Sequence, residues 1–235
     1  MSKGISSKKK LLSSKRKLVA KYDPKSPITE QYRTIRTNIL YSSIDEEIRS
    51  IMVTSSGPGE GKSTTTANLA VVFAQQGKSV LLVDADLRKP TVHYTFKLNN
   101  TIGLTSVLTN QVEIMSAVIK TDDENLYVLP SGPIPPNPSE LLGSKSMKHF
   151  IDKAKEEFDL IIFDTPPVLA VTDAQILGNL CDGIVLVVSS GKSEKELLIK
   201  TKELLTATKG RLLGVVLNNK KADKKGNYYY YYGAN

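Results

Sequence analysis

The sequence predicts an α/β domain with a doubly wound, mostly parallel sheet, and two observations lead to this prediction. First, short apolar runs rich in β-branched residues recur along the chain, and most of them are apolar throughout. Second, longer stretches with helical periodicity separate several of these runs. Strands without polar alternation, divided by helices, are typical of a parallel sheet that is covered on both faces.

The first expected elements are a helix over residues 26–43 and a strand over 51–54. Ser26 is a typical N-cap residue, and Pro27 suits the first helical turn. The apolar residues that then recur at helical spacing are Ile28, Tyr32, Ile35 and Ile39. Proline cannot donate a ladder hydrogen bond, so we expect an extended loop over residues 132–138, which include four prolines.

The remaining expected elements follow from the same two patterns. The strands are short apolar runs, and the helices are longer segments with a 3.6-residue spacing. In order along the chain they are helix 62–77, strand 80–84, strand 126–129, helix 146–157, strand 160–164, helix 172–180, strand 184–188, helix 193–208 and strand 212–217.

The composition limits the possible chemistry. With 235 residues, 40% hydrophobic and 24% charged, the chain is an ordinary globular protein of one domain. No apolar run reaches the roughly 18 residues of a membrane span, and no signal peptide is visible, so we expect a cytoplasmic protein. The single cysteine, Cys181, excludes an internal disulfide, and two histidines leave little room for zinc. Catalysis must therefore rest on carboxylates, lysine, arginine and the backbone.

The net charge of +8 lies entirely in residues 1–22, which contain eight basic residues and no acidic one. We therefore expect a basic flexible leader over 1–25, a folded domain over 26–219 and a flexible tyrosine-rich tail over 220–235. The leader is either a solvated tail or a tether to anionic lipid, to which each basic residue contributes about 1 kcal/mol. Nucleic acid is a weaker alternative, because no aromatic residues for base stacking interleave with the lysines.

A glycine-rich segment follows the first expected strand and precedes a helix, which is the order found in phosphate-binding loops. In such a loop the backbone amides hold nucleotide phosphates, a lysine reaches the β- and γ-phosphates, and a serine hydroxyl binds Mg²⁺. Lys62 and Ser63 would have these roles, although Ser56 stands where the consensus has glycine. The residues expected to bind ATP are Gly57, Pro58, Gly59, Glu60, Gly61, Lys62, Ser63 and Thr64.

Two further strands end in aspartates. Asp84 ends one strand and is followed by Asp86, and Asp164 ends another. Because the carboxyl ends of parallel strands meet at one edge of a sheet, we expect these side chains to converge near Lys62. Carboxylate oxygens beside phosphates suit Mg²⁺, so Ser63, Asp84 and Asp164 are the expected metal ligands. For Asp86, a helix cap is the alternative.

With these motifs the chain resembles the bacterial tyrosine kinases of capsule and exopolysaccharide synthesis, which have a phosphate-loop nucleotidase fold. The loop around Lys62 is similar to their Walker A motif, residues 81–88 to their second motif, and residues 160–167 to their Walker B motif. The resemblance extends to an E-x-x-R-x-x-R pattern that assembles rings and to a tyrosine cluster that the family phosphorylates on itself. These residues are Glu30, Arg33, Arg36, Tyr228, Tyr229, Tyr230, Tyr231 and Tyr232.

The ATPases that position chromosomes and division sites are related by fold and provide the main alternative function. They usually carry a signature lysine at the second loop position, where this chain has Gly57. The resemblance therefore favours a kinase over an ATPase that hydrolyses ATP without phosphorylating protein. A second alternative, a non-catalytic scaffold, would need a broken site, but Lys62, Ser63, Asp84 and Asp164 are all present.

The tail also suggests a phosphate acceptor on physical grounds. Five of the ten tyrosines are consecutive and follow several lysines, and as a strand they would be an aggregation hazard. A sticky end or a docking peptide is the alternative. Each phosphate adds about −1.5 to −2 charges, so full modification would cancel or reverse the net charge. The ten residues from Asn218 to Tyr228 span at most about 35 Å, so the arm could reach its own site or a neighbour's; the resemblance favours the neighbour.

Phosphoryl transfer depends mostly on positioning and charge stabilisation. We expect Lys62 to stabilise the γ-phosphoryl group and either Asp84 or Asp86 to accept the tyrosine proton. Arg88 is expected either to stabilise the transferred charge or to form a surface salt bridge. Asn218, which follows the last strand, is expected to contact adenine.

The resemblance also implies partners. Without a membrane span, the chain resembles the split form of the family, in which a separate membrane protein activates the kinase and recruits it to the inner face of the membrane. The expected partners are further copies of the chain in a ring, this activator, protein substrates such as sugar-nucleotide dehydrogenases, and a phosphotyrosine phosphatase.

Overall fold

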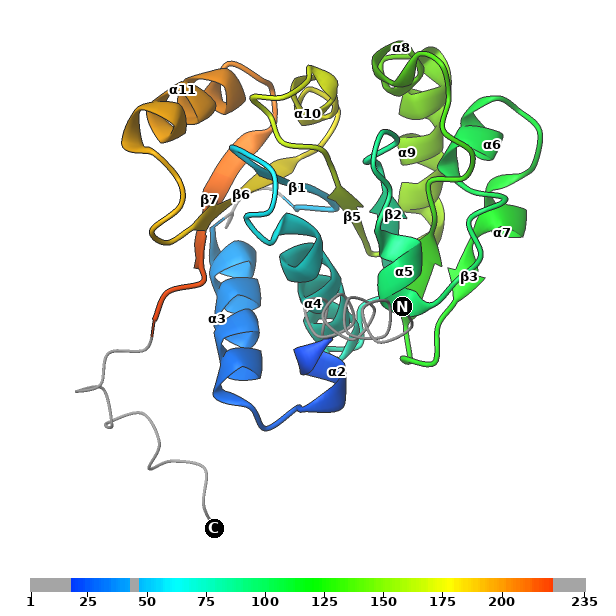
Figure 1. Ribbon diagram of the computed structural model, residues 1–235. Helices are drawn as coiled ribbons and strands as arrows, with labels where there is room; N and C mark the ends of the chain where they lie inside the picture. Colours follow the sequence, from blue (N-terminus) through cyan, green and yellow to red (C-terminus); the bar gives the residue numbers. More distant parts are fainter. Residues whose placement is uncertain (1–17, 43–46, 222–235) are drawn as a thin grey trace, which may run out of the picture.

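The computed structural model describes residues 18–42 and 47–221 (Figure 1). The strands are β1 (Ser50–Ser55), β2 (Val80–Asp84), β3 (Ile119–Lys120), β4 (Leu126–Leu129), β5 (Leu160–Asp164), β6 (Gly183–Ser189) and β7 (Arg211–Asn218). They form one sheet in the order β3-β4-β2-β5-β1-β6-β7. Every neighbouring pair is parallel except β3 and β4, so the predicted mostly parallel sheet is confirmed.

Helices cover both faces of the sheet, as expected from strands that are apolar throughout. One face is covered by α2 (Val19–Tyr22), α3 (Pro27–Tyr41), α4 (Lys62–Ala74) and α5 (Val92–Phe96). The opposite face is covered by α6 (Leu104–Leu108), α7 (Ile114–Ala117), α8 (Pro138–Leu142), α9 (Lys145–Glu157), α10 (Asp173–Gly178) and α11 (Lys195–Thr206). Figure 1 shows these two layers on either side of the strands.

The helix that follows the phosphate loop, α4, lies at the centre of its layer. Every residue from Thr65 to Ala74 is buried, because the sheet covers one side of α4 while α2 and α3 cover another. The sequence of α4 is accordingly rich in alanine, threonine and valine rather than amphipathic. This enclosure fixes the helix, and therefore the loop at its N-terminus, against the sheet.

The structured part of the chain begins earlier than the predicted boundary at residue 26. Leu18 and Ala20 are buried, and α2 packs against α4. The backbone N–H of Ala20 donates to Asn68 Oδ1 over 2.9 Å, and Gln75 Nε2 donates to the Ala20 carbonyl over 3.0 Å. The basic composition of the leader therefore concealed two apolar residues, Leu18 and Ala20, that pack on the core. Residues 1–17 and 222–235, with the tyrosine cluster, lie outside the described residues.

The six longer predicted strands and the five predicted helices are all found, with small shifts at their ends. Ser26 caps α3 as predicted, since its hydroxyl accepts from the backbone N–H of Ile28. In the described ranges, none of the helices is both long and apolar enough to cross a bilayer.

Candidate active site

The phosphate loop connects β1 to α4 and has the backbone that its glycines predict. Gly59 and Gly61 have φ values of +73° and +94°, a region that favours glycine. At Gly61 a Cβ atom would lie 2.0 Å from Asn218 Nδ2, so a larger residue would also displace the Asn218 side chain. Gly57, by contrast, lacks a positive φ and has open space around its Cβ position. The absence of a signature lysine there is therefore not imposed by the fold.

Glu60 stabilises the loop through hydrogen bonds of its side chain, whereas the sequence predicted it only as one of the residues that bind ATP. Its side chain is buried and accepts from Ser56 Oγ (2.9 Å), from the Gly57 N–H (3.0 Å) and from Ser193 Oγ. The serine at the first consensus position thus has a specific partner in this protein. Ser193 comes from the segment after β6, so Glu60 joins two loops that no motif connects.

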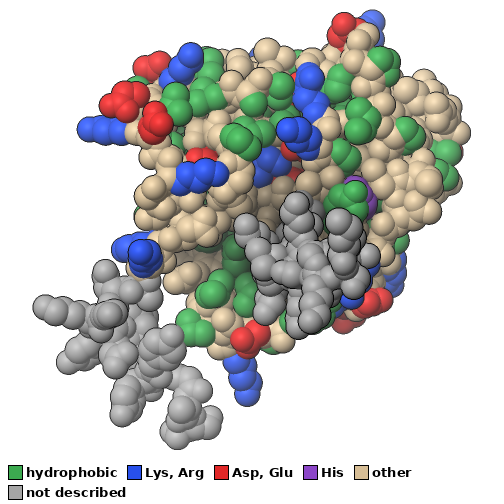
Figure 2. Space-filling view, in the orientation of Figure 1, with side chains coloured by type: hydrophobic (Ala, Val, Ile, Leu, Met, Phe, Trp, Pro, Cys, Tyr) green, Lys and Arg blue, Asp and Glu red, His purple; other side chains and the backbone are tan. Residues whose placement is uncertain are grey.

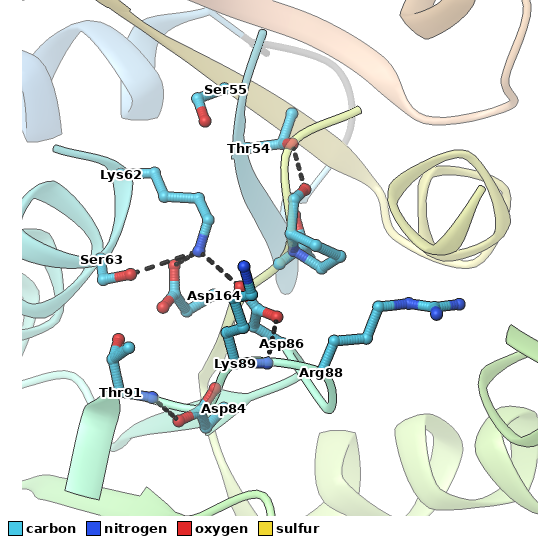
Figure 3. Close-up of polar contacts among 12 residues, drawn as sticks. Thr54, Ser55, Lys62, Ser63, Asp84, Asp86, Arg88, Lys89, Thr91 and Asp164 are labelled. Carbon is cyan, nitrogen blue, oxygen red and sulfur yellow. Dashed lines mark hydrogen bonds and ion pairs between the residues drawn. The ribbon is translucent and has the colours of Figure 1, made fainter. Parts of the chain in front are cut away.

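The ammonium group of Lys62 lies at the centre of the predicted acidic cluster (Figure 3). Its Nζ atom is 3.1 Å from Asp86 Oδ2, 3.3 Å from Asp164 Oδ1 and 3.2 Å from Ser63 Oγ. Burial alone would lower the pKa of Lys62, but the charges of Asp164 and Asp86 outweigh this effect and raise the pKa. Lys62 is therefore a cation at neutral pH, as a phosphate ligand must be.

Asp84 and Asp164 are neighbours in the β2–β5 register and both are fully buried. Asp84 Oδ2 accepts from the backbone N–H groups of Thr91 (2.8 Å) and Val92 (2.9 Å). Burial, followed by the proximity of Asp164, raises the pKa of Asp84 to about 7. Burial likewise raises the pKa of Asp164. Two carboxylates held this close and this deep oppose each other's ionisation unless a cation accompanies them.

The residues predicted to hold Mg²⁺ fit such a cation. Asp84 Oδ1 and Asp164 Oδ2 are buried without a hydrogen-bond partner, although buried carboxylate oxygens normally have one. Ser63 lies beside the same lysine. Within residues 18–42 and 47–221, no three acidic, histidine or cysteine side chains surround a metal by themselves. Magnesium would thus depend on Ser63 and on nucleotide phosphates as well as on the carboxylates, which is its usual binding mode beside ATP.

Arg88 does not face the phosphate loop. Its guanidinium group binds both carboxylate oxygens of Asp173 over 2.9 and 3.0 Å and donates to Ser139 Oγ over 2.8 Å. Figure 3 shows the side chain directed away from Lys62. Asp173 is fully buried at the start of α10. Because an unpaired buried charge is costly, the ion pair with Arg88 stabilises the Asp173 carboxylate. Arg88 thus forms a salt bridge, which was one of its two expected roles, and stabilisation of the transferred charge by Arg88 stays a prediction.

Asn218 lies against the loop rather than free at the sheet edge. Its Nδ2 atom donates to the Glu60 carbonyl over 2.9 Å, and Lys192 Nζ donates to the Pro58 carbonyl over 2.6 Å. Asn218 is the last residue of β7, and Lys192 follows β6, so both lie at the carboxyl edge of the sheet. The predicted contact with adenine stays a prediction.

In the space-filling view, basic and acidic side chains gather around a recess near the N-terminal end of α4 (Figure 2).

The residues expected to assemble a ring lie on α3 and have partners within the chain. Arg33 forms an ion pair with Glu30 on the same helix. Arg36 Nη1 donates to the Val72 carbonyl of α4 over 2.7 Å. Glu30 is exposed and Arg33 partly exposed, so both can make a further contact, whereas Arg36 connects two helices.

Comparisons with known proteins agree with this geometry. The model of the AAA domain family matches residues 48–195. "Tyrosine-protein kinase YwqD" of Bacillus subtilis is 60% identical over 209 residues, which are 89% of this chain and 88% of the relative. The crystal structure of "the chimerical protein CapA2B2" has 47% identity and a TM-score of 0.85, and the match covers 87% of this chain and 90% of the other. The "kinase domain of Escherichia coli tyrosine kinase ETK" has 31% identity and a TM-score of 0.83, with 91% and 85% covered.

A more distant match concerns the alternative function. The septum site-determining protein MinD of Pyrococcus horikoshii, "complexed with Mg-ADP", is 28% identical with a TM-score of 0.62. The match covers 72% of this chain and 69% of the other. The phosphate-loop fold is therefore shared with a division-site protein, as expected, but at lower similarity than with the kinases.

Proposed function

The chain belongs to the family of bacterial tyrosine-protein kinases, and we propose that it transfers the γ-phosphoryl group of ATP to Tyr228–Tyr232 of a neighbouring copy and to tyrosines of other proteins. One observation supports the proposal above the others. The Lys62 ammonium group lies between Asp86 and Asp164 at the phosphate loop, beside Asp84 and Ser63. Lys62 would bind the triphosphate together with the loop amides, and Ser63 and the aspartates would bind its Mg²⁺.

The proposed chemistry needs little covalent help from the protein, because phosphoryl transfer depends on positioning and charge. The amides of residues 57–64 bind the phosphates, and Lys62 stabilises the charge on the γ-phosphoryl group. Mg²⁺, held by Ser63, Asp84 and Asp164, would neutralise charge on the β- and γ-phosphate oxygens.

Of the two candidates for the tyrosine proton, we assign the acceptor role to Asp86. Asp84 is fully buried at the end of β2, which suits a structural and metal-binding role. Asp86 lies closer to the surface and meets Lys62 directly. A carboxylate must be within hydrogen-bond reach of the hydroxyl group that it deprotonates.

The test is the mass of the intact protein before and after incubation with magnesium-ATP. Two variants accompany the wild type, namely Lys62→Met and a chain that ends at Asn227. We expect phosphate increments in the wild type that are absent from both variants. Increments that survive the truncation would keep the kinase but reject the tail as its main acceptor.

A positioning ATPase would give a different result. It would hydrolyse ATP, this turnover would disappear with Lys62→Met, and no phosphate increment would appear on any protein. Because an activator can be required, the assay is repeated with the cytoplasmic part of the candidate membrane partner. ATP turnover without increments under both conditions would reject the proposed function.

We also propose partners for this kinase. Similarity to a chimerical protein named CapA2B2 supports a separate membrane activator that recruits the kinase to the inner face of the membrane. The basic residues 1–17 would add a contact with anionic lipid. Sugar-nucleotide dehydrogenases are the proposed substrates in capsule and exopolysaccharide synthesis, and a phosphotyrosine phosphatase would reverse the modification.

A further inference from the structure

Two adjacent cations follow Asp86, and their side chains run in opposite directions. Arg88 leaves the site and binds Asp173. In Figure 3 the Lys89 side chain instead runs past Asp86 towards the ammonium group of Lys62.

A hydrogen bond holds the backbone of Lys89 in place, whereas its side chain is exposed and can change conformation. Its backbone N–H donates to Asp86 Oδ1 over 3.0 Å, which fastens the residue to the carboxylate that also contacts Lys62. The side chain is exposed and has no ion-pair partner among residues 18–42 and 47–221. Lys62, by comparison, is largely buried and already paired with two carboxylates.

The charge balance of the site favours a second cation. Three aspartates surround Lys62, and a bound nucleotide would add the charges of its phosphates. Lys62 is shared between Asp86 and Asp164, while Arg88 is bound to Asp173. The transition state of phosphoryl transfer spreads negative charge over the equatorial oxygens, and positive groups placed beside these oxygens stabilise it. An ammonium group at the rim of the site can supply such a charge.

We propose that Lys89 is a catalytic residue that contacts the γ-phosphoryl group during transfer. This inference rests on the proposed kinase function. In the reaction the tyrosine oxygen forms a bond to the γ-phosphorus while the bond to the β–γ bridging oxygen breaks. ADP leaves with that electron pair, and the phenolic proton passes to a carboxylate. Lys89 keeps its protons and donates hydrogen bonds to the phosphoryl oxygens.

The experiment compares Lys89→Met and Lys89→Arg with the wild type. Arg88→Met is the neighbouring variant, and Lys148→Met replaces an exposed lysine on α9 as a matched control. The readouts are kcat and KM for tyrosine phosphorylation, ATP turnover, and the Kd of magnesium-ADP. Removing one such donor lowers kcat by roughly 10²- to 10³-fold in other enzymes. We expect Lys89→Met to lower kcat by at least tenfold and to change the Kd of ADP by less than threefold.

Other outcomes separate this inference from a structural role and from the kinase assignment. Lys89→Arg should recover part of kcat, because it restores the charge. Arg88→Met should lower the melting temperature, because Asp173 loses its partner, and should lower kcat less than Lys89→Met does. If Lys89→Met keeps kcat within threefold of the Lys148→Met control, or raises only the KM of the acceptor protein, the inference is wrong. If the wild type hydrolyses ATP without phosphorylating tyrosine, the kinase assignment fails, and the effect of Lys89→Met on ATP turnover still tests the lysine.

Discussion

A buried carboxylate in a loop that binds an anion is unexpected at the residue scale, because its charge opposes that of the phosphates. Glu60 is such a group, and its hydrogen bonds explain its presence. It holds the Ser56 hydroxyl, the Gly57 N–H and the Ser193 hydroxyl in one network. The carboxylate therefore preorganises the loop before a nucleotide arrives.

We predict that Glu60→Ala weakens ATP binding. Leaving such buried donors without a partner costs about 1–3 kcal/mol, which corresponds to a roughly 5- to 150-fold increase in Kd. The Kd of a fluorescent ATP analogue measures this effect, and Glu157→Ala, an exposed glutamate on α9, is the control. An unchanged Kd for Glu60→Ala would show that the loop keeps its shape without the network.

Asp182 has a similar bracing role at the opposite edge of the sheet, where it affects stability rather than binding. It accepts from the Arg49 N–H, from the Ser50 N–H and hydroxyl, and from Lys155 Nζ. Burial alone would raise the pKa of Asp182, but these hydrogen bonds lower it. A lowered pKa means that the carboxylate stabilises the fold above its unfolded pKa near 4, and that this contribution is lost as the pH falls through the folded value.

We predict that Asp182→Asn lowers the free energy of unfolding at pH 7 by about 1–2 kcal/mol, since partial exposure weakens these interactions. Urea unfolding at several pH values measures the difference between variant and wild type. The difference should shrink below about pH 4. A difference that is independent of pH would show that the effect is one of shape and not of charge.

At the scale of elements, α3 contacts both solvent and the helix of the phosphate loop. Burial raises the pKa of the Tyr32 hydroxyl on α3, and a hydrogen bond with Thr65 on α4 partly offsets this. One turn further, Arg36 donates to Val72. The helix expected to assemble rings is thus attached to the helix that begins at Lys62.

We predict that Arg36→Ala destabilises even the isolated monomer, by about 1–3 kcal/mol, because the Val72 carbonyl loses its charged donor. Arg33→Ala should change stability by less than about 0.5 kcal/mol, because Arg33 pairs only with Glu30 on its own helix and Glu30 is exposed. Unfolding at concentrations where light scattering shows monomers measures both. Equal effects of the two substitutions would contradict the intramolecular role of Arg36.

The elements also show what the sequence can predict. Long apolar strands and long helices, such as β5 and α9, have enough periodicity to be found directly, and the strand order brings Asp84 and Asp164 together as expected. The short elements β3 and α5–α8 have two to five residues each, too few to show a period. The direction of Arg88 depends on Asp173, which is 85 residues away. Such a partner has no local signature, and the same holds for Ser193 and Glu60.

For the whole molecule, the pair of exposed Glu30 and partly exposed Arg33 offers a surface for a second copy. We predict that Arg33→Ala with Arg36→Ala lowers the mass of the assembly without blocking ATP binding. A second test exchanges the pair, as Glu30→Arg with Arg33→Glu. This variant keeps an ion pair within α3 but reverses the charges that a neighbour would meet. Light scattering should show smaller assemblies for both double variants. An unchanged mass for both double variants would show that α3 does not form the ring contact.

Phosphorylation should act on the same assembly through charge. Five phosphates on Tyr228–Tyr232 would add about −8 to −10 charges to a chain whose net charge is +8, and each ring would hold several such tails close together. Repulsion between them acts over about 10 Å at 0.1 M salt and is screened as salt increases. We therefore predict that fully phosphorylated protein has a lower assembly mass at low salt and regains mass at high salt. The chain that ends at Asn227, treated with the same magnesium-ATP, should keep its mass throughout. If the phosphorylated protein keeps its assembly mass at low salt, charge repulsion between tails does not control the ring, and release would have to depend on the loss of a specific contact between a tail and its neighbour's site.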